Sequence, residues 1–240
     1  MPLQIVGPQR LYRQIAEQLR VLIGEGEFPA GSRLPAERDL AKQLGVSRPS
    51  VREALIAMEV EGWIDIRTGS GIYVLGQTAK RALNGKAATL PANEWGPLEL
   101  IRARRVVEGE TAAMAALQAR RKDRDAMRKA IVAMKASAAA GELPLDGDRD
   151  FHTAIVASSG NAVLIETVQG FWDSRRGPLF TRLGGYFETL KSWQAAIAEH
   201  EAILDAIDAK DAPAARSAMH QHMDKSHARF SASWRRAKAN

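Results

Sequence analysis

Residues 34–74 constrain the fold more than any other part of the chain. An apolar rhythm of three to four residues predicts a helix over 36–44, and Gly45, directly after it, readily adopts the left-handed conformation that ends a helix. Ser47 is a good N-cap for a second helix, which is expected to stop near Gly62. The segment therefore predicts two helices joined by a tight turn.

A two-stranded hairpin follows these helices. Apolar and polar residues alternate over 64–67, glycines at 69 and 71 supply a turn, and 72–75 return as a second strand. Two helices and a hairpin in this order predict a winged helix-turn-helix.

The second helix of such a motif lies in the major groove of DNA, where its first residues contact base edges. Arginine there can bind guanine with two hydrogen bonds. The alternative is that these residues are solvated charges on a small helical domain. The candidate DNA-binding residues are Arg38, Ser47, Arg48, Pro49, Ser50, Arg52, Thr68 and Gly69.

The charge of the chain is unevenly distributed. The net charge is +6 over 240 residues, yet residues 1–76 contain nine Lys and Arg against nine Asp and Glu. DNA affinity must therefore come from the placement of individual arginines and from dimerisation.

The chain has no cysteine, which excludes disulfides and thiolate metal ligands. The sequence shows no secretory or membrane-spanning run, so we expect a cytoplasmic protein with no membrane partner.

The rest of the chain predicts a mostly α fold. An opening helix over 8–25 would bury Leu11, Ile15, Leu19 and Leu22. Residues 8–76 then form the DNA-binding domain, and 77–96 a linker with a short helix at 78–84. Residues 97–235 form an antiparallel bundle. Its six helices are expected at 97–119, 123–140, 146–158, 161–174, 186–209 and 212–235, with breaks at 177–178 and 184–185 among others.

Four residues of this bundle form a candidate metal site. Asp148 and His152 are four residues apart and share one helix face, while His200 and His222 lie on the apolar faces of two later helices. One carboxylate and three imidazoles suit zinc or another borderline divalent metal. The alternative is that each histidine is a core residue satisfied by its own hydrogen bond. The spacing leaves both interpretations open.

The N-terminal segment resembles a known family. The stretch LPAERDLAKQLGVSRPSVREAL, followed by EGWIDIRTGSGIYV, is similar to the DNA-binding domain of GntR-family bacterial transcription regulators, in their FadR-like branch. The resemblance implies that Arg38, Arg48, Arg52 and Gly69 contact operator DNA.

The bundle resembles the ligand-binding domain of the same branch, the FCD domain, through the motifs DRDFHTAIVASSGN, AEHEAILDAI and AMHQHM. This resemblance implies that Asp148, His152, His200 and His222 bind a divalent metal, often zinc, with nickel and manganese as alternatives. It also implies a small carboxylate effector that completes the metal's coordination.

Two further residues are candidate effector contacts. The resemblance places Arg104 toward the pocket, but an ion pair with Glu108 one turn later explains it equally well. Asn161 is either a helix cap or a pocket contact.

The effector class is narrowed by one segment, IETVQGFWDSRRGPLF, which resembles FCD regulators of hexuronate and related sugar-acid metabolism. Lactate, dicarboxylates and aldonates remain alternative effectors.

The predicted function is a homodimeric regulator, a repressor of a catabolic operon. It is expected in the bacterial cytoplasm, and on the nucleoid when bound to double-stranded operator DNA. The alternatives are a metal-sensing regulator and a metal-dependent enzyme fused to a DNA-binding domain.

Overall fold

The computed structural model describes residues 10–76, 90–91 and 93–232. These residues separate into two compact units. One unit holds the described residues up to Pro97 together with Pro178–Leu183, and the other holds Leu98–Gly177 with the described residues from Gly184 onward. Most of the predicted linker, including the short helix expected at 78–84, lies outside the described residues.

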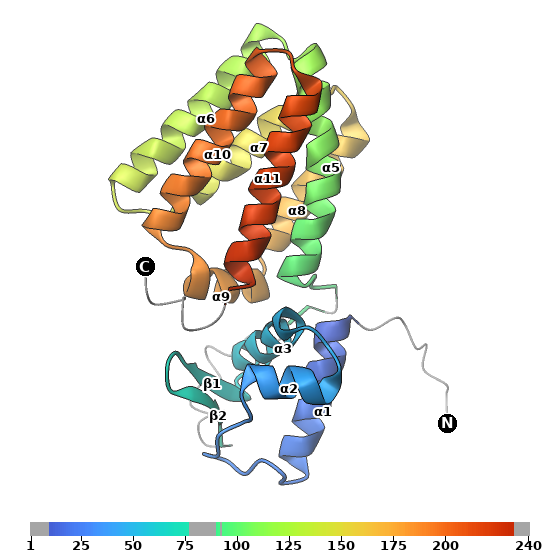
Figure 1. The fold of residues 1–240 in the computed structure, drawn as a ribbon, viewed down its shortest axis with the longest axis vertical. Coiled ribbons are helices and arrows are strands. Elements are labelled where there is room, and N and C mark those ends of the chain that lie inside the picture. Colours follow the sequence, from blue (N-terminus) through green and yellow to red (C-terminus); the bar gives the residue numbers. More distant parts are fainter. Residues whose placement is uncertain (1–9, 77–89, 92, 233–240) are drawn as a thin grey trace. The chain divides into compact units, whose positions relative to one another are not determined.

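The first unit contains the predicted winged helix-turn-helix. Three helices precede a two-stranded antiparallel sheet (Figure 1). The elements are α1 (Leu11–Gly24), α2 (Glu37–Leu44), α3 (Arg48–Val60), β1 (Ile64–Arg67) and β2 (Gly71–Val74).

The turn between α2 and α3 is built as its residues predict. Gly45 adopts a φ of 65°, and its N–H bonds to the carbonyl of Ala41 at the end of α2. Ser47 then caps α3, because its side chain accepts a hydrogen bond from the backbone N–H of Ser50 at 3.2 Å. Pro49 lies in the first turn of α3, where its missing N–H costs little.

The core of this unit lies under α3 and the hairpin. The predicted apolar stripe of α3 is fully buried, and the hairpin pairs Ile64 with Val74 and Ile66 with Ile72. These four strand residues are buried while their neighbours are more exposed, so the predicted alternation holds. The stripe consists of Val51, Ala54, Leu55 and Met58.

The buried face of α1 differs from the predicted one. Ile15 and Leu19 are buried as expected, but Leu11 is 48% exposed and Leu22 is 36% exposed. The helix instead buries Tyr12 and Ala16 beside them. Both patterns have helical spacing, and the sequence does not show which of two adjacent stripes meets the core.

The second unit is helical throughout its described part, which confirms the mostly α fold. Within it α6 packs against α7 and α10, α7 packs against α8, and α10 packs against α11. The helices of the C-terminal half, from Pro97 to Phe230, are α5 (Pro97–Gln118), α6 (Arg121–Ala139), α7 (Leu145–Ala157), α8 (Ala162–Arg175), α9 (Pro178–Phe187), α10 (Leu190–Asp208) and α11 (Ala212–Phe230) (Figure 1).

The prediction was wrong around α9 and α10. The break predicted at 177–178 is present, because α8 ends at Arg175 and α9 begins at Pro178. The sequence also predicts a break at 184–185 and one helix over 186–209, but Gly184 and Gly185 lie inside α9. Glycine is a poor helix former, yet the buried side chains of α9 outweigh that preference. The actual break is at Thr189, whose side chain accepts a hydrogen bond from the backbone N–H of Ser192 and caps α10.

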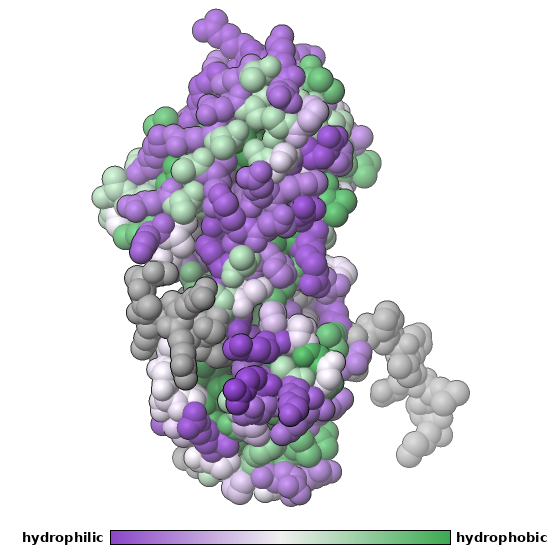
Figure 2. Space-filling model, viewed as in Figure 1, coloured by the Kyte–Doolittle hydropathy of each residue, from purple (hydrophilic) through white to green (hydrophobic). Residues whose placement is uncertain are grey.

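The surface is mainly polar. On the face drawn in Figure 2, hydrophilic residues predominate and apolar residues are scattered between them. Single exposed apolar side chains such as Leu117, which is 74% exposed, are ordinary on a protein surface. None of the helices in the described ranges is long and apolar enough to cross a membrane.

Replacing Leu55 with alanine should lower the free energy of unfolding by about 2–5 kcal/mol, because the side chain is completely buried and its removal leaves a cavity. Val21, which is 47% exposed on α1, is the matched control, and Val21→Ala should change stability by no more than about 0.5 kcal/mol. Urea denaturation of the full chain measures both. Equal effects of the two substitutions would show that the core of this unit is misplaced.

Candidate functional site

The four predicted metal ligands meet inside the helical unit. α7 carries Asp148 and His152 one turn apart, α10 carries His200, and α11 carries His222. All four side chains are buried, with exposures between 0 and 5%. One ligand atom from each residue lies within 4.8 Å of the others, so the group could hold a metal ion.

The imidazole nitrogens are arranged around the carboxylate of Asp148. His200 Nε2 lies 3.0 Å from Asp148 Oδ1, and His152 Nε2 lies 3.5 Å from the same oxygen. His152 Nε2 and His200 Nε2 are 3.2 Å apart. Asp148 Oδ1 is buried but accepts no well-aligned hydrogen bond from the described residues. A divalent cation would satisfy this oxygen, so the donor set fits a metal.

Two glutamate carboxylates contact the Nδ1 atoms of two of the three imidazoles. Glu108 on α5 contacts His152 Nδ1, and Glu199 Oε2 on α10 lies 2.8 Å from His222 Nδ1. A partner on Nδ1 fixes the ring and leaves Nε2 as the ligand atom. The sequence analysis did not assign Glu199, although it precedes His200 directly.

Burial and charge set the protonation of the cluster. Burial raises the pKa of Asp148, but the imidazoles of His152 and His200 outweigh it and hold this pKa well below its usual range. Burial likewise opposes ionisation of Glu108, yet Arg104 and His152 lower its pKa to about 2.

The pKa values of the three histidines are shifted in different directions. Burial lowers the pKa of His200 and lowers that of His222 further. Burial also acts downward on His152, but Glu108 and Asp148 overcome it and raise the pKa of His152 above its ordinary value. Of the three imidazoles, His152 is therefore the one that holds its proton most strongly against a metal.

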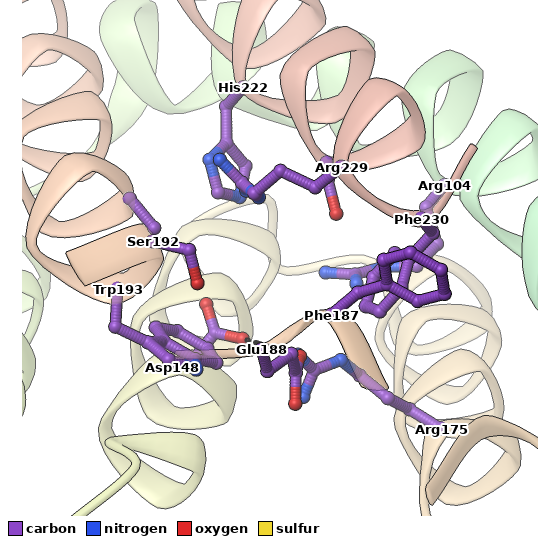
Figure 3. A pocket seen from close by; sticks show the side chains of 12 residues that line it. Arg104, Asp148, Arg175, Phe187, Glu188, Ser192, Trp193, His222, Arg229 and Phe230 are labelled. Carbon is purple, nitrogen blue, oxygen red and sulfur yellow. Dashed lines mark hydrogen bonds and ion pairs between the residues drawn. The ribbon is translucent and has the colours of Figure 1, made fainter. Parts of the chain in front are cut away.

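A pocket adjoins this cluster. It is open to solvent on one side and is lined by charged, polar and aromatic side chains. Figure 3 shows Asp148 and His222 in the lining, with Arg104, Arg175 and Glu188 around the same opening. Because Asp148 and His222 belong to both the cluster and the lining, a molecule in the pocket would lie beside the metal position.

Arg104 forms the predicted ion pair with Glu108 and also lies in the pocket lining, so both interpretations of this residue hold. Its Nε donates to Glu108 Oε1 at 2.6 Å, and the side chain also lines the pocket and lies over the ring of Trp172 at 4.4 Å. Asn161 is different, because it is not among the lining residues. Its side-chain oxygen accepts hydrogen bonds from the backbone N–H groups of Val163 and Leu164 at the start of α8, so the structure favours the capping role.

Two arginines and a carboxylate of the lining were not assigned from the sequence. Arg175 ends α8, Glu188 follows α9, and Arg229 lies in the last turn of α11. No spacing rule connects them, because each comes from a different helix. The packing of the bundle alone brings them to one pocket.

The candidate DNA-binding residues lie on the first unit. Ser47 and Arg48 are exposed at the start of α3, and Pro49 and Ser50 are partly exposed beside them. The side chain of Arg38 is 79% exposed on α2. Thr68 and Gly69 form the tip of the hairpin, where Gly69 has a φ of 82°.

The structure differs from the sequence-based prediction at Arg52. The sequence places it off the apolar stripe of α3 with the other DNA-facing residues, but the structure leaves it 1% exposed. Its guanidinium forms two hydrogen bonds of 2.9 Å with Glu37, a buried carboxylate that also accepts from Arg48 Nε at 2.9 Å. The residue faces the preceding helix because Glu37 supplies the buried partner that its charge requires.

A winged helix-turn-helix joined in one chain to a helical unit with a buried cluster that could hold a metal is the arrangement expected of a DNA-binding transcription regulator. Comparison with known families agrees. Residues 11–74 match the model of bacterial regulatory proteins of the gntR family, and residues 99–225 match the FCD domain. The chain belongs to the gntR family and carries an FCD domain.

Curated relatives extend over most of the chain. The Uxu operon transcriptional regulator of Escherichia coli K12 is 37% identical over 220 residues, covering 90% of this chain and 85% of the relative. The Exu regulon transcriptional regulator of the same strain is 33% identical over 225 residues, covering 92% and 85%. Among solved structures, E. coli McbR/YncC matches with a TM-score of 0.49 at 22% identity, over 93% of this chain and 98% of that one. The Uxu and Exu relatives are transcription regulators rather than enzymes, and the enzyme alternative is set aside.

Arg38→Ala and Arg52→Ala should separate DNA contact from folding. Removing the exposed Arg38 side chain should weaken operator binding by roughly 1–3 kcal/mol and leave the urea midpoint unchanged. Removing Arg52 leaves the buried Glu37 carboxylate without its main partner and should lower the free energy of unfolding by about 3–5 kcal/mol. Fluorescence anisotropy with an operator selected from random duplexes measures binding. An Arg52→Ala protein of full stability would contradict the buried ion pair.

Metal binding should weaken in acid. With Zn²⁺ as a probe on chelator-treated protein, affinity should fall between about pH 8 and pH 6, because protons compete for the imidazoles and the pKa of His152 is raised. Calorimetry in buffers of different ionisation enthalpy should detect proton release on binding. His220→Ala, which removes an imidazole outside the cluster, should bind as wild type does, and His200→Ala should not bind. An affinity that does not change with pH would exclude ligation by these imidazoles.

Proposed function

We propose that this chain is a homodimeric repressor of a catabolic operon, and that a small sugar acid bound beside a divalent metal is its effector. The observation that carries the proposal is the shared position of Asp148 and His222, which belong to the metal cluster and also line the pocket. A carboxylate bound in the pocket would therefore lie beside the metal.

Zinc is the metal we favour. Three imidazoles and one carboxylate are ligands that zinc accepts, and nickel and manganese are alternatives with similar donors. The ligands would be Asp148, His152, His200 and His222. When bound, the ion supplies a positive charge for an effector carboxylate, and Glu108 and Glu199 hold two of the imidazoles in place.

The proposed effector is a sugar acid because two observations agree. The relatives include regulators named for the Uxu operon and the Exu regulon, and residues 165–180 resemble regulators of hexuronate metabolism. The pocket adds the required polar groups, with Arg104 beside the cluster and Ser192 and Ser226 in the lining. Among sugar acids we favour hexuronates, with aldonates as the alternative, and lactate and dicarboxylates are the competing classes.

On the DNA side, we assign base and phosphate contacts to Arg38 and to the exposed start of α3, with the hairpin tip at Thr68 and Gly69 beside them. Two copies related by a two-fold axis would read a palindromic operator with half-sites about one helical turn apart. Effector binding lowers operator affinity through a coupling free energy between the two sites, and operator binding lowers effector affinity equally. The protein would act in the bacterial cytoplasm, on the nucleoid when bound.

A metal-sensing regulator is the second candidate. Four buried donors can complete a tetrahedral shell, the arrangement found where a metal is held without a further ligand. In that case operator affinity follows metal concentration, and organic acids have no effect.

Thermal unfolding of the purified chain with hexuronates, aldonates, lactate and dicarboxylates tests the proposal. An acid present at about 100 times its dissociation constant should stabilise the metal-loaded protein by roughly 2.7 kcal/mol. Chelation or His200→Ala should abolish that shift, and His220→Ala, outside the cluster, should retain it. The same acid should weaken operator binding in an anisotropy titration.

Other outcomes decide between the candidates. If chelation alone changes operator affinity and no acid produces a shift, the metal is the signal. If neither acids nor chelation have any effect on stability or DNA binding, the buried cluster is a structural core and the proposal is wrong.

A further inference from the structure

One ion pair closes the pocket on the side away from His222. Arg175, the last residue of α8, donates from Nη2 to Glu188 Oε1 at 2.8 Å, and both side chains are largely buried, at 11 and 14% exposure. Figure 3 shows the two side chains together at one edge of the opening, below Asp148 and opposite His222.

This pair is close to the metal position. Arg175 Nη2 also lies 3.7 Å from Asp148 Oδ2, so one guanidinium connects a metal ligand with Glu188. Arg175 and Glu188 are therefore within reach of an acid whose carboxylate binds at the cluster.

The positive charge of the lining is already matched. Each of the three lining arginines has a carboxylate partner, so none offers an unbalanced charge to a second acidic group. The pairs are Arg104 with Glu108 at 2.6 Å, Arg175 with Glu188 at 2.8 Å, and Arg229 with Glu199 at 3.4 Å.

The surroundings of Glu188 favour a hydroxyl over a carboxylate. Burial raises the pKa of Glu188, with Arg175 acting against the rise and Asp148 adding to it, so the position already has more negative charge than it readily supports. A second ligand carboxylate would add a like charge there, whereas a hydroxyl would donate a charge-assisted hydrogen bond to the Glu188 carboxylate.

We infer that Glu188 is a specificity-determining residue, which makes the pocket select a polyhydroxylated monocarboxylate over the dicarboxylate of equal length. It does so by occupying Arg175 and by accepting a hydrogen bond from an effector hydroxyl. The inference rests on the proposed function, because it requires an effector carboxylate at the metal. It explains how a pocket with three arginines can refuse a dianion.

Gluconate and glucarate form a matched pair of probes, since they share a carbon chain and differ in having a hydroxymethyl or a second carboxylate at the far end. Calorimetric titration of the metal-loaded full chain should give a gluconate affinity at least roughly tenfold above that for glucarate. Hexanoate, which lacks the hydroxyls, should bind more weakly than gluconate.

Glu188→Gln keeps the size of the side chain and releases Arg175 to accept a second carboxylate. The ratio of glucarate to gluconate affinity should rise by roughly tenfold or more in this variant. Glu201→Gln is the control, because Glu201 is an exposed carboxylate paired with Lys135 and lies outside the lining. It should leave the ratio unchanged.

The double variant Arg175→Gln with Glu188→Gln removes both charges together, so it leaves no unpaired charge buried if the single variant folds poorly. It should lose the rise in relative glucarate affinity that the single variant gains. A wild-type protein that binds glucarate as tightly as gluconate, or a ratio that Glu188→Gln does not change, overturns the inference while the effector site stands. A wild-type protein that binds no acid in the presence of metal overturns the proposed function and the inference with it.

Discussion

The helical unit depends on the burial of one carboxylate and three imidazoles at a single point. Groups of this kind are costly to remove from water unless each has a partner. The bundle supplies partners from several helices, since Glu108 contacts His152 and Glu199 contacts His222. The buried Asp148 oxygen lacks a well-aligned donor among the described residues, which gives the cluster its capacity for a cation. α7, α10 and α11 are the helices that bring these groups together.

The charged groups of the pocket beside the cluster are also matched in pairs. Each lining arginine is matched by an acidic residue from the bundle, so the interior is close to neutral around the opening. Strong positive charge is then concentrated where a cation would bind. In the proposed complex a ligand would be oriented by its single carboxylate at the cation, and the remaining lining would distinguish neutral groups. Orientation and selectivity would then be carried by different residues of one cavity.

The parts of this arrangement that obey local periodicity could be predicted from the sequence. Asp148 and His152 are one helical turn apart, and Gly45 with Ser47 determines the turn of the DNA-binding unit. Features that depend on distant partners could not be predicted. Arg52 has a helical position compatible with exposure, and only the packing of α2 against α3 places Glu37 beside it. The lining group made by Arg175, Glu188 and Arg229 has no sequence signature for the same reason, and α9 forms despite two adjacent glycines.

The carboxylate of Glu37 has a consequence for how DNA is read. It holds Arg48 at the exposed start of α3 while it binds the buried Arg52, so the rotamers of both side chains are restricted before any duplex arrives. The conformational entropy of these long side chains is then largely lost during folding rather than during association. If Arg48 contacts DNA as proposed, a side chain held in this way would discriminate between sequences more sharply, because a mismatched base could not be accommodated by rearranging a flexible arginine.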